Sequence, residues 1–148
     1  MSLASSTKRI LLTVPIEPVP LARPRFSRGR AYLPKRSQDF RQAIQEVASI
    51  AMDSLEPFTD ALFCRLAFYR KFKPTARNFG DCDNLVKAIF DALNGICYRD
   101  DAQIVDVRAI KRQDKDEPRV VIDIGCIGFE KKSPQRVITP FEEGIDEQ

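Results

Sequence analysis

The residues of this chain best suited to chemistry are carboxylates and one lysine in the stretch GDCDNLVKAIFDALNGICYRDD, residues 80–101. Asp81 and Asp83 stand one residue apart near its start, and Asp100 and Asp101 form an adjacent pair at its end. Clustered carboxylates repel one another, so holding several of them ionised requires a cation. An all-oxygen site suits Mg²⁺, or Mn²⁺ in its place, because these ions prefer a few carboxylates with waters and phosphate oxygens. The pattern therefore indicates a divalent-metal site.

The rest of the composition excludes several other kinds of site. The 148 residues include no histidine, which removes Ser-His-Asp and Cys-His catalysis. The four cysteines have no CxxC spacing, so a structural zinc site is excluded and they are expected to be reduced, buried hydrophobes. A calcium-binding EF-hand loop starting at Asp81 would place Leu85 and Ala92 where oxygen ligands are needed. There is no glycine-rich motif to cradle a nucleotide cofactor.

Each acidic feature also has a simpler structural interpretation. Asp83 alone is more often a helix N-cap, and Asp83 with Lys87 is more often a surface pair four residues apart, which contributes a few tenths of a kcal/mol. The combination favours a site, since Asp81 and Asp83 stand at the start of a predicted helix and Lys87 one turn inside it. Whether Asp100 and Asp101 return to the same end depends on the sheet.

The elements that must position these residues can be read from periodicity. We expect a strand over residues 10–16, then a loop or short hairpin, because Pro24 and Pro34 prevent a helix there. Ser37 is the predicted N-cap of a helix that ends near Pro57. A strand over residues 62–72 should bury Leu62, Cys64, Leu66 and Phe68 on one face.

The second half of the chain carries the stretch with the carboxylates. A helix over residues 85–94 is predicted with Gly95 at its C′ position, followed by strands near residues 103–112 and 119–127. The turn between those strands is the five residues 114–118, so they are expected to form an antiparallel hairpin. The prediction is an α+β, single two-layer domain: a mixed β-sheet with two helices packed on one face. The domain is placed at residues 10–127, between a flexible N-terminus (1–9) and a mobile C-terminal tail (128–148).

Positive charge is concentrated in one segment. Residues 18–38 contain no acidic residue and six basic ones, which points to a polyanionic partner, although a solvated basic face is the simpler alternative. The residues expected to bind this polyanionic partner are Arg23, Arg25, Arg28, Arg30, Lys35, Arg36, Lys73, Arg77 and Phe79. Phe79, like Phe26, lies in a basic loop and could stack on an unpaired base, with core packing as the more common alternative.

The run DCDNLVKAIFDAL, followed by the acidic pair and Gln103, closely resembles the RusA family of Holliday-junction resolvases. The family pattern is DxDNxxKxxxDxL and then DDxQ, after an N-terminal strand and a basic loop. The matched core covers roughly residues 80–103, and the general layout agrees from about residue 10 to 127. The resemblance implies a homodimeric, Mg²⁺-dependent endonuclease that resolves four-way DNA junctions by paired symmetric nicks in DNA recombination and repair.

Site residues are carried over from the family by position. The resemblance implies that Asp81, Asp83, Lys87 and Asp101 are catalytic, and that Asp81, Asp83 and Asp101 bind the metal, with Asp100 as the alternative third ligand. It implies a cytoplasmic, bacterial or phage-encoded protein with no membrane partner and no nucleotide cofactor. The alternative is a catalytically silent DNA-binding protein of the same fold, which predicts the loss of an acidic residue or the lysine. All of them are present.

Overall fold

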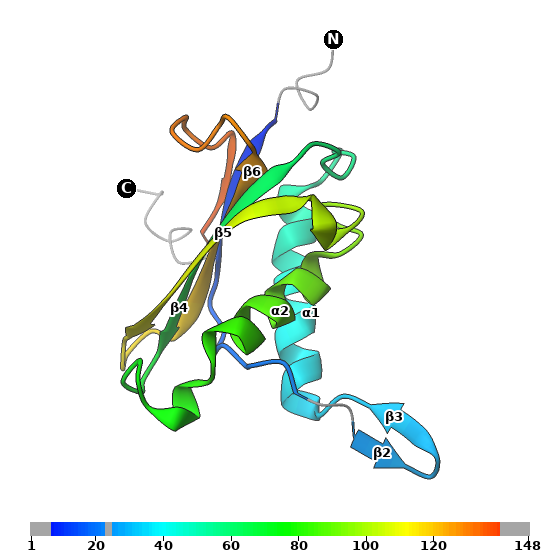
Figure 1. The fold of residues 1–148 in the computed structure, drawn as a ribbon, viewed down its shortest axis with the longest axis vertical. Coiled ribbons are helices and arrows are strands. Elements are labelled where there is room, and N and C mark those ends of the chain that lie inside the picture. The colour runs from blue at the N-terminus through cyan, green and yellow to red at the C-terminus, as the bar shows by residue number, and fades with distance from the viewer. Residues whose placement is uncertain (1–6, 23–24, 140–148) are drawn as a thin grey trace, which may run out of the picture.

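A mixed five-stranded sheet, with two α-helices on one of its faces, is the frame of the molecule in the computed structural model, which describes residues 7–22 and 25–139 (Figure 1). The predicted two-layer α+β fold is confirmed. The sheet order is β5-β4-β6-β1-β7, and a separate two-stranded hairpin, β2–β3, projects from the body. The elements are β1 (Arg9–Val14), β2 (Arg25–Ser27), β3 (Arg30–Tyr32), α1 (Lys35–Ala51), β4 (Leu62–Arg70), α2 (Cys82–Leu93), β5 (Ile104–Gln113), β6 (Arg119–Cys126) and β7 (Arg136–Ile138).

The core lies between the sheet and the two helices. In β4, Leu62, Cys64, Leu66 and Phe68 are buried as their alternation predicts, and Arg65 is exposed on the opposite face. The helices add the buried side chains of Phe40, Ile44, Ala48, Ala51, Leu85, Ala88, Ile89, Ala92 and Leu93. Burying one such Leu, Ile or Phe side chain contributes about 1.5–3 kcal/mol. Within the described ranges, neither helix is long and apolar enough to cross a membrane.

The predicted hairpin between the last two long strands is wrong. β4 lies between β5 and β6, pairing in parallel with β5 and antiparallel with β6. The connection after β5 crosses the end of β4, where the Asp114 amide donates to the Arg70 carbonyl at 2.8 Å. Bridging one intervening strand requires only about 10 Å, which five residues span easily. A short loop between two antiparallel strands therefore does not make them neighbours.

Several element boundaries also differ from the sequence prediction. α1 begins at Lys35 after Pro34, so Ser37 lies in its first turn and is not the N-cap. The helix ends at Ala51 rather than near Pro57, and Ser54 then takes a positive φ of 68° in the turn. β1 runs over Arg9–Val14, one residue earlier at its start and two at its end than predicted.

The sheet extends further along the chain than residue 127. β7 pairs in parallel with β1, with Val137 opposite Leu11. The Gln135 side chain supports this edge by accepting hydrogen bonds from the amides of Lys8 and Arg9, both at 2.9 Å. The predicted C-terminal boundary at residue 127 therefore falls before β7. A three-residue strand is too short to show a periodicity in the sequence. The rest of the predicted tail, residues 140–148, and residues 1–6 lie outside the described residues.

The turn between β5 and β6 gives a test of stability against pH. Arg119 donates to the Asp114 carboxylate at 2.9 Å and, with the amides of Glu117 and Asp116, lowers the pKa of Asp114. A lowered folded-state pKa adds stability above the unfolded-state value of about 3.9, and this is lost as the pH falls through the folded-state value. We expect Asp114→Asn to lower the free energy of unfolding at pH 7 and to make little difference at about pH 2, measured by urea titration. An equal loss at both values would contradict the charge assignment.

Candidate active site

The N-terminus of α2 presents the first pair of carboxylates to solvent. Asp81 is the N-cap residue by its backbone (φ −76°, ψ 142°), but its side chain makes no capping hydrogen bond. Asp83 lies in the first helical turn, and both residues are exposed. The amides at the start of a helix have no intrahelical partner, and the helix dipole is positive there. Two carboxylates are thus available at a position that favours negative charge.

Gly80 fixes the approach to this pair. Its backbone (φ 100°, ψ 153°) is one that only glycine adopts readily, and a Cβ there would lie 2.4 Å from Cγ of Pro20. The amide of the next residue, Leu21, donates to the Asn84 carbonyl at 3.1 Å. The segment that leads into the β2–β3 hairpin is therefore held directly against the start of α2.

Lys111 was not foreseen as part of this region. Its amine donates to the Gly80 carbonyl at 2.9 Å, one residue before Asp81. In β5 it alternates with Val107 and Ala109, whose register partners are the core residues of β4, so it is a charge on the side that faces the helices. A basic residue at an inward position was the signal that could have identified it.

Phe79 belongs to the core, so the core-packing alternative holds for it. The side chain, in a short 3-10 helix (Arg77–Phe79), is 0% exposed and cannot stack on a base. Its ring lies near two cations, with the Lys111 amine 5.1 Å and the Arg70 guanidinium carbon 5.8 Å from its centroid. Arg70 also donates to the Phe79 and Asn78 carbonyls at 2.7 and 3.2 Å and forms an ion pair with Glu17 at 2.6 Å. These contacts fix the loop that precedes Asp81.

Lys87 lies on the exposed side of α2. Its amine is 4.0 Å from the Asp91 carboxylate, one turn further along, and its side chain is 61% exposed. An exposed pair at this distance contributes little to stability, so the long side chain keeps its freedom to move toward a ligand. Lys87 is therefore an exposed, weakly paired cation between the two ends of the helix.

Asp100 and Asp101 have different environments. Asp100 caps a short 3-10 helix (Asp101–Gln103), its carboxylate accepting from the Ala102 amide at 2.9 Å. Gln103 accepts from the amides of Arg99 and Asp100 at 3.1 and 3.2 Å. Because the capping role occupies Asp100, the half-buried Asp101 is the better candidate of the two for ligand binding.

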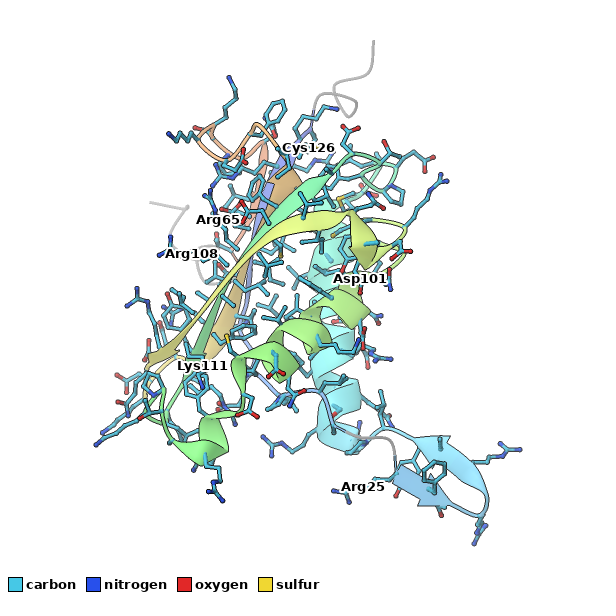
Figure 2. The ribbon with its side chains drawn as sticks, in the orientation of Figure 1. Arg25, Arg65, Asp101, Arg108, Lys111 and Cys126 are labelled. Carbon is cyan, nitrogen blue, oxygen red and sulfur yellow. The ribbon has the colours of Figure 1, made fainter. Side chains whose placement is uncertain are left out.

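The structure does not bring Asp101 to Asp81 and Asp83. Asp101 follows the far end of α2, a helix whose 12 residues span about 18 Å. β5 then runs back, and Lys111, beside Gly80, lies about 20 Å along it. Figure 2 shows Asp101 and Lys111 at opposite ends of α2. Among the described residues of one chain there is accordingly no group of three or more Asp, Glu, Cys or His side chains that could hold a metal.

The basic residues lie on the surface around the start of both helices. β2 and β3 form the predicted hairpin, whose turn residues Arg28 and Gly29 have positive φ angles of 53° and 77°. This conformation suits a two-residue hairpin turn. Phe26 in β2 is 77% exposed. The expected DNA-binding residues Arg25, Arg28, Arg30, Lys35, Arg36, Lys73 and Arg77 are all exposed, and Arg23 lies outside the described residues. Figure 2 shows Arg25 on the projecting hairpin.

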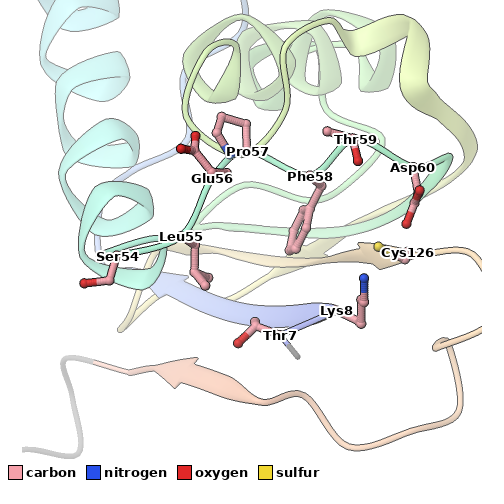
Figure 3. Close-up of a pocket in the computed structure, with 10 residues that line it drawn as sticks. All are labelled: Thr7, Lys8, Ser54, Leu55, Glu56, Pro57, Phe58, Thr59, Asp60 and Cys126. Atoms are coloured by element: carbon pink, nitrogen blue, oxygen red, sulfur yellow. The ribbon is translucent and has the colours of Figure 1, made fainter. Parts of the chain in front are cut away.

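A hollow of about 360 Å³ lies away from the Asp81–Asp83 pair, where β6 ends and β1 begins (Figure 3). Its lining includes Lys8, Phe58, Asp60 and Cys126. Gln103 donates to the carbonyls of Phe58 and Asp60 at 2.8 and 3.2 Å, which fixes the wall of the hollow to the segment that carries Asp101.

The comparisons with known proteins agree with the sequence pattern. The model of the family described as endodeoxyribonuclease RusA matches residues 15–125, which include the start of α2, the acidic pair and the basic hairpin. The chain therefore belongs to the RusA family of endodeoxyribonucleases, a class of nucleases that act on DNA junctions. It is similar to "Uncharacterized protein YqaN" of Bacillus subtilis (strain 168), with 33% identity over 137 residues that cover 78% of this chain and 94% of the relative.

Two glycines test how strongly Pro20 packs against the start of α2. Gly80 and Gly95 both have positive φ angles (100° and 84°), but a Cβ at Gly95 would meet no atom within 4 Å. Gly95→Ala should cost about 1–2 kcal/mol for the backbone conformation alone. Gly80→Ala should cost at least about 1 kcal/mol more, because the added methyl overlaps Pro20. Equal losses in urea titrations would show that the Pro20 contact is not tight.

Proposed function

We propose that this protein is a Mg²⁺-dependent, structure-selective endonuclease that resolves four-way DNA junctions by paired symmetric nicks, acting as a homodimer in recombination and repair. The observation that carries the proposal is the exposed Asp81–Asp83 pair at the start of α2, held beside the root of a basic hairpin. In a family of endodeoxyribonucleases, this combination of oxygen ligands and cations suits a phosphodiester substrate.

The donor chemistry suits the proposed ion, but one chain does not assemble the whole ligand set. Asp81 and Asp83 offer carboxylate oxygens of the kind that Mg²⁺ and Mn²⁺ prefer. The third proposed ligand, Asp101, lies at the other end of α2, so the described residues of a single chain do not bring three carboxylates to one ion. When bound, a divalent ion supplies an activated water and neutralises charge on the phosphate.

The chain's own residues bind and orient the scissile phosphate. The unpaired amides and positive dipole at the start of α2 favour a phosphate near Asp81. Lys87 is the proposed catalytic cation: its exposed amine can approach the phosphate from the outer side of the helix and stabilise charge that develops there. Lys111 adds fixed positive charge beneath the same loop, because its amine donates to the Gly80 carbonyl, whereas the charge of Arg70 is offset by its ion pair with Glu17.

The hairpin is proposed to hold the DNA backbone. Arg25, Arg28 and Arg30 are exposed along it, and contacts to phosphates carry no base information, so recognition by shape follows. Phe26 takes the stacking role that Phe79 cannot take, since its ring is exposed at the hairpin. Symmetric resolution requires two nicks, and a twofold dimer supplies two equivalent sites. All four cysteines are free, which is in keeping with the reducing cytoplasm that we propose as its location.

Cleavage assays test the catalytic assignment. Wild-type protein with Mg²⁺ should cut a mobile four-way junction and leave the linear duplex of the same sequence largely intact. Asp83→Asn should slow junction cleavage by about 100-fold or more, because Asp83 is proposed to hold the divalent ion that supplies the activated water. Asp53→Asn is the matched control, because Asp53 is an exposed carboxylate just beyond the C-terminal end of α1, the end opposite to Lys35. Cleavage by Asp83→Asn within a few-fold of wild type would overturn the assignment, and junction binding without any wild-type cleavage would favour a silent DNA-binding protein.

Two hairpin substitutions separate phosphate contact from stacking. Arg28→Ala should weaken junction binding and reduce the slope of log K against log salt concentration by about 0.9. Phe26→Ala should weaken binding by about 1–3 kcal/mol with an unchanged slope, because stacking releases no counterions. Fluorescence anisotropy over a series of salt concentrations measures both quantities. A hairpin that does not contact DNA would leave affinity and slope unchanged in both variants.

A further inference from the structure

The outer face of the sheet, on the side away from α1 and α2, carries no helix in the described part of the chain (Figure 1). A shallow hollow of about 280 Å³ lies on it. The partly exposed apolar side chains that line this hollow come from β1, β4, β5 and β6: Leu11, Ala67, Ile110 and Val121. An apolar patch with a charged rim is typical of a contact surface.

A row of paired residues crosses this face from one edge to the other. Its members, as successive register partners, are Val137, Leu11, Asp123, Arg65 and Arg108. Figure 2 shows Arg65 and Arg108 on the side of the sheet away from the helices. Two like charges on neighbouring strands repel each other, so their position favours an anion between them.

The nearest carboxylate on the row does not neutralise these two arginines. Asp123 accepts from Arg9 through both oxygens, at 2.9 and 2.8 Å, in a largely buried ion pair. Arg65 donates to the Glu130 carbonyl at 3.3 Å. The ion pairs found among the described residues include neither Arg65 nor Arg108.

The other charges of the outer face leave this excess in place. β5 presents one carboxylate, Asp106, and one further cation, Arg112, on the same side. Arg119 of β6 is paired with Asp114 at 2.9 Å. A DNA backbone would use the free cations but not the apolar centre, because its contacts are to phosphates. A peptide segment with carboxylates and a large apolar side chain uses both.

The chain itself carries such a segment directly after β7. β7 leads to the edge of the outer face, where Ile138 is the register partner of Leu12. Pro140 has no amide to continue the pairing, so the chain must leave the edge there. Residues 140–148, PFEEGIDEQ, contain four carboxylates and no cation, with apolar side chains at Phe141 and Ile145.

We propose that this acidic tail docks across the outer face, with Phe141 on the apolar centre and Glu143 between Arg65 and Arg108. β4 lies three strand spacings from β7, which is about 14 Å. Residues 140–143 in an extended conformation span about 13–14 Å, so the reach is sufficient. Alternate residues of an extended segment face one way, so Phe141, Glu143 and Ile145 contact the sheet together.

Docking on this face separates the negative charge of the tail from the basic hairpin. Exposed arginines such as Arg25, Arg28 and Arg30 attract any nearby polyanion, including an acidic segment of the same chain. A tail held by Arg65 and Arg108 does not compete with DNA for the hairpin. The outer face is thereby a second binding surface of the fold, distinct from the one that serves the proposed function.

A tryptophan in the tail reports docking, because the chain contains none of its own. In Phe141→Trp protein we expect acrylamide to quench the indole fluorescence less than in the same protein unfolded in urea. Adding Arg65→Glu and Arg108→Glu should lower the docking constant by about tenfold or more, because two ion pairs become repulsive contacts. The quenching constant should then rise toward the value of the unfolded chain.

Arg28→Glu with Arg30→Glu is the matched control for that pair, since it changes the net charge equally at exposed arginines of the hairpin. It should leave the quenching constant unchanged, with circular dichroism showing that both variants are folded. Stronger quenching in the hairpin variant alone would place the tail on the hairpin. Full quenching with every arginine present would leave the outer face to a separate partner. Either result would overturn the proposal.

Amide chemical shifts locate the tail without a substitution on the outer face. A chain that ends at Thr139 keeps every strand of the sheet. Compared with the full chain, it should have shifted amide resonances at Arg65, Ala67, Arg108 and Ile110, three and four strands from the truncation, and unchanged ones in the hairpin. Shifts confined to β7 and β1 would contradict docking, and shifts that vanish on dilution of the full chain would indicate docking between copies instead. None of these measurements requires cleavage, so the proposed function can fail while the docking stands.

Discussion

The hydrogen bond from Lys111 to the Gly80 carbonyl ties β5 to the start of α2, and the layout of the acidic residues depends on it. α2 carries the chain away from Asp81, and the turn at Asp101 brings it back along β5 to the same loop. Asp101 lies where the chain turns between α2 and β5, at the end of α2 opposite to Asp81. Rigid elements of this length cannot bend to close the gap, since the backbone hydrogen bonds of both would have to break. The distance between the two carboxylate groups is a consequence of topology.

The local elements could be predicted because their signals are local. The alternation of Leu62, Cys64, Leu66 and Phe68 specifies which face of β4 is buried, and Gly95 ends α2 with the positive φ that glycine permits. The spacing of Asp81, Asp83 and Lys87 on a helix likewise follows from sequence. The strand order could not be obtained in this way. β4 lies between β5 and β6, and its buried side chains complete the core there. The loop that connects β5 to β6 contains no residue pattern that indicates a strand between them.

The surroundings of the site also depend on contacts between distant segments. Phe79 looks like a loop aromatic in sequence, yet Arg70 from β4 and Lys111 from β5 enclose it together with the core. The environment of two cysteines is likewise set by the fold. Burial raises the pKa of the Cys97 thiol to about 12 and that of Cys64 further still, so both remain protonated and unreactive at neutral pH. These two thiols are therefore poor nucleophiles, and they do not compete with the carboxylates as candidates for the site.

Structure-selective cleavage requires that two phosphates be held in a fixed geometry. One flexible contact cannot hold them in this way. Exposed arginines on a hairpin attract the DNA backbone but do not select a particular phosphate, because phosphate contacts are similar on every duplex. Position comes from rigid elements, and in this chain the start of α2 is fixed to the sheet through Lys111 and to the preceding segment through Leu21. The Asp81–Asp83 pair therefore keeps a defined position relative to the sheet, which a pair on a free loop would not have.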